Sequence, residues 1–137
     1  MSAMETGAER WAARYARVAL GAAFLSGIAS RFGLWGRDAG YGDFAHFVEY
    51  TAQVNSFMPA STIPSLAWAA TAAELVLGIA LIAGARVRWA ALGSAVLLTL
   101  FGLAMAVSFG LKSPLDYSVF SASACAVLLA LHPLRTA

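Results

Sequence analysis

Hydrophobic and polar residues are arranged along this chain in long blocks. Four apolar stretches, at about residues 15–36, 65–84, 89–111 and 114–132, contain few or no charged residues. Each is close to the ~20 residues that a helix needs to cross the hydrocarbon core of a bilayer. Helices are expected because hydrocarbon offers no partners for open backbone groups. The pattern therefore predicts an all-α integral membrane protein built as a four-helix bundle.

The sizeable polar interruption lies between the first two spans, at residues 37–64. Its start is rich in glycine and predicts a turn, and Asp43 is a suitable N-cap for a following helix. One face of that helix would be mostly apolar: Phe44, Phe47, Val48, Thr51 and Val54. We expect a short amphipathic helix lying in the outer membrane interface. Residues 1–14 are expected to form a frayed cytoplasmic tail before one membrane domain at residues 15–132.

Basic residues in short loops set the orientation of membrane helices. With four spans, one side would carry Arg10, Arg14, Arg17, Arg86, Arg88 and Arg135, and the other would carry Arg31, Arg37 and Lys112. This imbalance predicts that both termini are cytoplasmic. A cleaved signal peptide is the alternative for the first span, but its apolar stretch continues beyond the 7–15 residues typical of a signal core.

Composition limits the classes of function. The chain has 137 residues, of which 61% are hydrophobic and 12% are charged, and its net charge is +2. The basic residues are spread over several segments, so nucleic acid is not expected as a partner. A lone cysteine, Cys125, excludes an internal disulfide and argues against an enzyme that uses paired thiols. His46 and His132 would lie on opposite sides of the membrane, and no metal-ligand spacing is present.

Glu74 is the residue that stands out, because it lies alone near the middle of the second span. A carboxylate at that depth costs roughly 2.5–3.5 kcal/mol on insertion scales, so it is usually retained for a reason. Small residues share its side of the helix: Ala67, Ala70, Thr71 and Gly78. Such faces are where membrane helices pack closely, so Glu74 should point into the bundle.

Arg31, near the outer end of the first span, is the expected partner of Glu74. At about 1.5 Å per residue, the two side chains would differ in depth by only about 7 Å, which a stretched arginine can bridge. We therefore predict an intramembrane Arg31–Glu74 ion pair. It could be structural, fixing the register of the helices, or it could form a proton or ligand site.

Two further groups invite functional interpretation. Aromatic residues gather near the outer end of the first span and could line a cleft for a quinone or lipid, although an aromatic belt is the alternative: Phe32, Trp35, Tyr41, Phe44 and Phe47. Before the fourth span, Ser113 is expected to be an N-cap and Asp116 the acid at N3. No residue is assigned a catalytic role.

The order of several segments resembles the DoxX family. These are Arg17-x-x-x-Gly21-x-x-Phe24-Leu25-Ser26-Gly27, the Glu74-to-Gly84 segment followed by Arg86 and Arg88, Gly42-Asp-Phe-Ala-His-Phe, and Lys112-Ser-Pro-Leu-Asp-Tyr. Many relatives carry lysine near the end of the first span, where this chain has Arg31; arginine holds its proton more firmly. The resemblance implies a small four-helix protein of the bacterial inner membrane, some relatives of which are subunits of oxidoreductase complexes.

The functional expectation is a membrane subunit that docks or supports a redox partner, with a quinone as the candidate cofactor. It would contact the lipid bilayer, a redox protein and, in an oligomer, other copies of itself. The alternative is a small proton-coupled transporter that acts through Glu74. Four helices leave little room for a pore within one monomer, so this alternative requires an oligomer.

Overall fold

The computed structural model describes residues 6–132, and within this range it contains helices and no strand. The elements in chain order are α1 (Gly7–Arg31), α2 (Phe44–Val54), the 3-10 turn η1 (Ala60–Thr62), α3 (Ile63–Ala83), α4 (Val87–Phe109), α5 (Lys112–Asp116) and α6 (Val119–Leu131). The predicted all-α class is confirmed. The prediction for Arg135, and that for the first five residues of the tail, fall outside the described residues.

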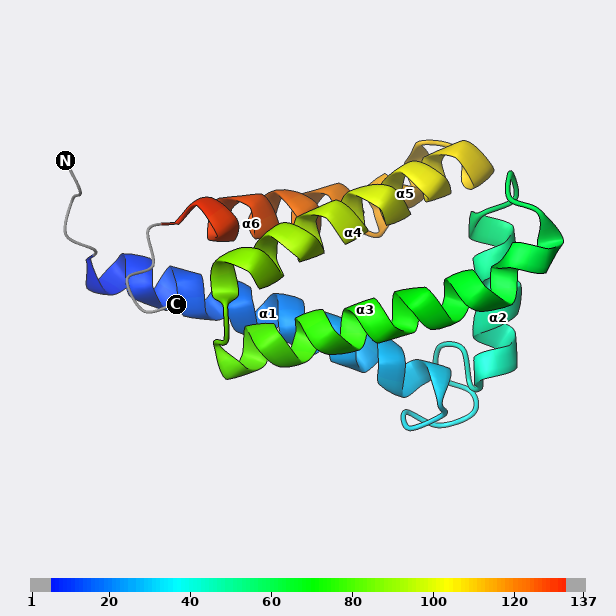
Figure 1. Ribbon diagram of the computed structural model, residues 1–137, viewed down its shortest axis with the longest axis horizontal. Helices are drawn as coiled ribbons and strands as arrows, with labels where there is room; N and C mark the ends of the chain where they lie inside the picture. Colours follow the sequence, from blue (N-terminus) through cyan, green and yellow to red (C-terminus); the bar gives the residue numbers. More distant parts are fainter. Residues whose placement is uncertain (1–5, 133–137) are drawn as a thin grey trace.

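The long helices form two pairs, α1 with α3 and α4 with α6 (Figure 1). Glycine allows the first pair to approach closely. A Cβ atom added to Gly21 would lie 2.9 Å from the carbonyl oxygen of Gly78 and 2.8 Å from Ile82 Cγ1. Small residues at such crossings are how helices pack in a membrane, where there is little hydrophobic force to drive them together.

A tight turn joins α3 to α4 and thereby joins the two pairs. Gly84 ends α3 in the left-handed conformation, with φ of 74°. Beside the turn, Leu81, Val87 and Ala91 are almost completely buried in the main apolar cluster. Away from the turn, α3 and α4 diverge (Figure 1). The packed core therefore lies at the turn end of the molecule, and the opposite end is more open.

Helix α2 lies across that opposite end (Figure 1). As predicted, Asp43 is its N-cap, because the carboxylate accepts a hydrogen bond from the backbone N–H of His46 at 2.9 Å. This hydrogen bond is the main reason that the pKa of Asp43 is lowered. At the other end, Ser108 on α4 donates to the carbonyl oxygen of Val54 and contacts Ser56. These contacts attach α2 to α4.

The prediction of a frayed N-terminal tail is wrong over the residues described. Helix α1 begins at Gly7 with a reciprocal capping box between Thr6 and Glu9. These two hydrogen bonds satisfy backbone donors that a helix start leaves open. The basic segment that precedes the first span is thus part of one long helix.

The predicted continuous fourth span is also corrected. The chain forms α5 and then α6, which are separated where Ser118 adopts a left-handed conformation with φ of 56°. Helix α6 alone has 13 residues, which at 1.5 Å per residue is about 20 Å and shorter than the ~30 Å hydrocarbon core. Ser113 lies inside α5 and is not its N-cap, while Asp116 pairs with Lys112 at the surface.

Within residues 6–132, two helical segments are long and apolar enough to cross a membrane, Ala60–Ala83 and Val87–Phe109. Much of their apolar surface faces outward; for example, Val76 and Val107 are 66% and 70% exposed. The core helix of a soluble protein would bury such side chains, whereas lipid accepts them. Exposed apolar faces thus suit a membrane setting for both segments.

Candidate binding cavity

A cavity of about 1060 Å³ lies between the two helix pairs, at the end covered by α2. Its walls come from α1 through α4, from the loop after α1, and from the α5–α6 junction. Most of the lining is apolar, and a few polar side chains converge at one place: Arg31, Tyr41, Tyr50, Thr51 and Glu74. An apolar cavity with a few convergent polar groups is the usual form of a small-molecule site.

Arg31 and Glu74 are brought together at the wall of this cavity. Arg31 ends α1 and is 4% exposed, and Glu74 lies in the middle of α3 and is 5% exposed. Arg31 Nη2 forms an ion pair with Glu74 Oε2. Arg31 Nη1 donates a hydrogen bond of 2.9 Å to the hydroxyl of Thr71, which lies one turn earlier on α3. Both ends of the guanidinium are thereby held against α3.

Phe47 from α2 covers the guanidinium. Arg31 Cζ lies 3.8 Å from the centroid of the Phe47 ring, a close cation–π contact. Arg31 Nε is buried and has no hydrogen-bond partner among residues 6–132. The pair is therefore shielded from water by three helices, and its two charges largely neutralise each other.

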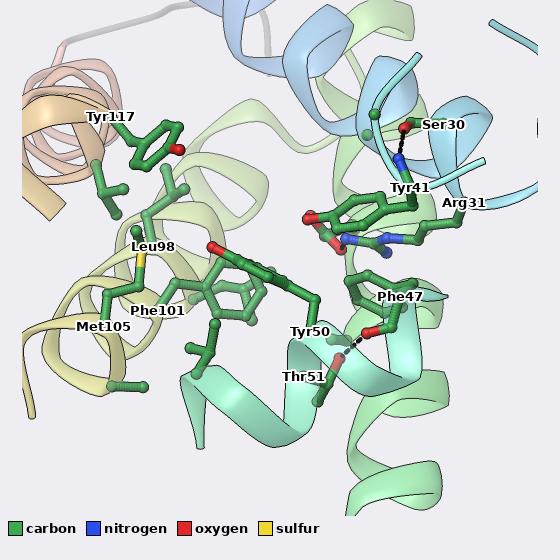
Figure 2. A pocket seen from close by; sticks show the side chains of 18 of the residues that line it. Ser30, Arg31, Tyr41, Phe47, Tyr50, Thr51, Leu98, Phe101, Met105 and Tyr117 are labelled. Carbon is green, nitrogen blue, oxygen red and sulfur yellow. Dashed lines mark hydrogen bonds and ion pairs between the residues drawn. The ribbon is translucent and has the colours of Figure 1, made fainter. Parts of the chain in front are cut away.

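Tyr41 lies beside this ion pair (Figure 2). Its backbone N–H donates to Ser30 Oγ at 2.9 Å, which fixes the loop against α1. Glycine is needed just before it, because Gly40 has φ of 66° and an added Cβ would lie 2.0 Å from Ser30 Oγ. Burial, with a smaller effect of Tyr50, raises the pKa of Tyr41 to about 12. Its hydroxyl therefore stays protonated at physiological pH.

Tyr50 and Tyr117 extend the polar lining away from the ion pair. The ring centroids of Tyr41 and Tyr50 are 5.5 Å apart. Figure 2 shows Tyr50 between the Arg31 side and the side formed by Leu98 and Met105, with Tyr117 opposite. Burial also raises the pKa of Tyr50, so its hydroxyl is neutral as well. The cavity thus has a polar end at Arg31 and Tyr41 and an apolar wall along α4.

Only part of the predicted aromatic cleft lines the cavity. Trp35, Tyr41 and Phe47 do so. Phe32 and Phe44 do not, because they stack on each other and on Trp68, with Phe44 and Trp68 centroids 4.1 Å apart. Trp68 is exposed on α3. It offers an outer surface on which Phe32 and Phe44 are packed away from the cavity.

Several cavity residues escaped the sequence reasoning. Thr71, beside the cavity, was placed on the helix face of Glu74, but its hydrogen bond with Arg31 was not predicted. Tyr50 was missed because it borders the polar face of α2, one turn after His46, and is partly buried there. Tyr117 lies at the α5–α6 break, which no glycine signals in the sequence.

No group of three or more histidine, cysteine or acidic side chains that could hold a metal is found within residues 6–132. Cys125 is partly buried and packs against the main apolar cluster, away from the cavity lining. His46 lies on the exposed face of α2 beside Asp43. The polar chemistry of the cavity is that of one ion pair and several hydroxyl groups.

Comparison with known proteins places the chain in a family. Residues 9–116 match the family described as methylamine utilisation protein MauE. No curated protein and no solved structure matches the chain. The match confirms the coarser part of the expectation, a small membrane-protein family, under the description MauE. It covers the Arg31–Glu74 pair and nearly all of the cavity lining, and the chain therefore belongs to the MauE family of membrane proteins.

Proposed function

We propose that this protein is a membrane subunit that supports a redox system used in methylamine metabolism, with the Arg31–Glu74 pair as its central feature. The observation that carries the proposal is this buried pair at the wall of a cavity of about 1060 Å³. The family name supplies the metabolic setting. Using methylamine as a nutrient involves oxidising its carbon–nitrogen bond, so electrons must be passed to an acceptor.

We further propose four membrane crossings, made by α1, α3, α4 and the α5–α6 unit, in a single domain of residues 15–132. The start of α1, the α3–α4 turn and the end of α6 lie at one end of the molecule, as an even number of crossings requires (Figure 1). Basic residues are concentrated at that end: Arg10, Arg14, Arg17, Arg86 and Arg88. Their excess favours a cytoplasmic location for it, and hence the bacterial inner membrane.

A quinone is the candidate cofactor, and the residues of the cavity fit one. Its head is a flat, uncharged ring with carbonyl oxygens, which accept hydrogen bonds. The apolar wall would contact the ring, and the hydroxyls of Tyr41 and Tyr50 can donate to the carbonyls. A bound quinone would supply the capacity to accept and release electrons. This chain would bind the molecule, orient it and exclude water.

Docking of a redox protein is proposed for the outer face of α2. Its polar side chains are exposed there, including His46, Glu49 and Gln53. Because α2 also covers the ion pair through Phe47, a partner bound there would lie close to the cavity. Self-association through the apolar outer helix faces would be compatible with this arrangement.

The function is tested by mild extraction from native membranes, followed by mass spectrometry of the bound chains and small molecules. We expect a redox protein to co-purify with the wild-type protein. Growth on methylamine should fail for Glu74→Gln while the variant still inserts at wild-type abundance. Asp38→Asn, which changes an exposed carboxylate in the loop after α1, is a control for the loss of one acidic group. Normal growth of Glu74→Gln, together with extraction of the chain alone, would refute the proposal.

A proton-coupled transporter acting as an oligomer through Glu74 is the second candidate. It is favoured by one observation, a carboxylate that lines a cavity inside an apolar helix. Proton flux into liposomes that disappears in Glu74→Gln would favour this alternative. Wild-type liposomes that show no flux above empty ones would exclude it.

A further inference from the structure

We propose that the cavity binds an uncharged, membrane-soluble molecule with a hydrogen-bond-accepting head, and that this molecule enters sideways from the bilayer between α3 and α4. The inference rests on the proposed membrane function and assigns a ligand class and an entry route to the same site. Its evidence is the shape of the cavity, the residues at the gap and the balance of charge at the polar end.

The gap between α3 and α4 gives the entry route. From α3, residues Leu66, Ala69, Ala70 and Ala73 line the cavity, and from α4, Leu97, Leu100 and Phe101 do so. Ala69 and Leu100 are also exposed on the outer surface, Leu100 by 58%. The cavity wall is therefore continuous with surface that faces lipid. Nearer the turn the gap is closed, because Leu77 packs against Gly93. A Cβ atom added to Gly93 would lie 3.0 Å from Leu77 Cδ2.

The α3 side of this gap is lined by alanine at three positions. Ala69, Ala70 and Ala73 recur at spacings of one, three and four residues, so they share one helix face. Their small side chains leave the space that a bulky residue would fill. At this level α3 and α4 diverge (Figure 1), so the small side chains leave the gap between these two helices unfilled.

The polar end determines the charge of the ligand. Arg31 and Glu74 neutralise each other, and Thr71 and Phe47 occupy the remaining sides of the guanidinium. An ionised ligand would lose its hydration and find no free opposite charge in the cavity, so its binding would be unfavourable. A neutral ligand loses much less hydration free energy. The charge balance therefore favours an uncharged head.

The hydroxyl groups determine the polarity of that head. Tyr41 and Tyr50 line the space next to the ion pair, and Figure 2 shows Tyr50 projecting between the two sides of the cavity. Within residues 6–132, neither hydroxyl is hydrogen-bonded to another protein group. Tyrosine hydroxyls donate readily to carbonyl oxygen. A carbonyl head beside these rings, with an apolar body along α4, matches the distribution of groups.

Quinones and fatty-acid esters are both lipophiles with uncharged carbonyls, and three probes distinguish them from each other and from a hydrocarbon. The purified protein in detergent micelles is titrated with a quinone bearing a ten-carbon tail, with a methyl ester of similar length, and with decylbenzene. We expect at least one carbonyl probe to bind tenfold or more tightly than decylbenzene. The preferred carbonyl probe identifies the source. Equal binding of all three probes, or binding of none, overturns the proposal.

Two variants test the route and the head separately. Ala70→Phe should block the gap and slow association of the carbonyl probe at least tenfold, whereas Ala72→Phe, on the exposed face of the same helix, should bind at the wild-type rate. Tyr50→Phe, which removes one hydroxyl, should weaken the affinity for the carbonyl probe several-fold and leave decylbenzene unaffected. A wild-type association rate in Ala70→Phe refutes the route, and wild-type affinity in Tyr50→Phe refutes the head assignment. The assay needs no partner chain, so it is independent of the co-purification test.

Discussion

At the scale of single residues, the arginine at the end of α1 illustrates how a charge is kept inside an apolar protein. Its guanidinium has an ion-pair partner, a hydroxyl acceptor and an aromatic cover, from Glu74, Thr71 and Phe47. Each supplies part of what water would otherwise provide. The three contacts come from two helices, so Arg31 also fixes how α2 and α3 lie relative to α1.

Thr71→Val should destabilise the protein by about 1–3 kcal/mol, because the change leaves a donor of the buried guanidinium unsatisfied while preserving side-chain shape. The measurement is thermal unfolding in detergent micelles. Thr71→Ser retains the hydroxyl and should lose much less stability. Equal losses in the two variants would show that the hydrogen bond to Arg31 contributes little.

Tyr41 predicts a pH dependence. Its pKa is raised to about 12, so the folded protein holds this proton more firmly than the unfolded chain does. That contribution to stability should be fully present below pH ~10, the ordinary tyrosine pKa, and should be lost as pH rises through about 12. A spectrophotometric titration should show a late-titrating tyrosine that is absent in Tyr41→Phe. Unchanged late titration in Tyr41→Phe would contradict the assignment.

At the scale of helices, the apolar blocks predicted α3 and α4 well. The expected spans at residues 65–84 and 89–111 differ by about two residues from Ile63–Ala83 and Val87–Phe109. Composition was sufficient because both helices are apolar on nearly every side. The amphipathic pattern and the Asp43 cap likewise predicted α2.

The fourth span was less predictable. Its break lies at Ser118, which has a positive φ. Serine rarely adopts such a conformation, so its presence in the sequence did not indicate a break as a glycine would have. The start of α1 was missed for a different reason. Charged residues there suggested a tail, although the capping box of Thr6 and Glu9 was visible in the sequence.

The α5–α6 break makes its own prediction. A β-branched residue is strained in the left-handed region, so Ser118→Val should lower the free energy of unfolding by about 1–2 kcal/mol. Ser121→Val, on the exposed face of α6, is the matched control and should change it little. Thermal unfolding of both variants gives the comparison. Equal stability would mean that the chain does not hold Ser118 in this conformation.

At the scale of the whole molecule, two helix pairs joined firmly at one end account for the cavity at the other. The turn end is filled by a continuous apolar cluster that includes Leu81, Val87 and Leu129. Beyond it the pairs separate, and α2 covers the opening (Figure 1). The contact between Arg31 and Glu74 followed from helix register and depth. The cavity did not, because it depends on the divergence of α3 from α4, which no local pattern encodes.

A double-mutant cycle on Arg31 and Glu74 tests the central claim most directly. Arg31→Met and Glu74→Leu are made singly and together, and the free energy of unfolding of each is measured in the same micelles. Each single change leaves the other charge buried and should cost about 3–5 kcal/mol, whereas the double change should recover most of that loss. If the two single losses simply add in the double variant, the two charges do not form the pair on which the account depends.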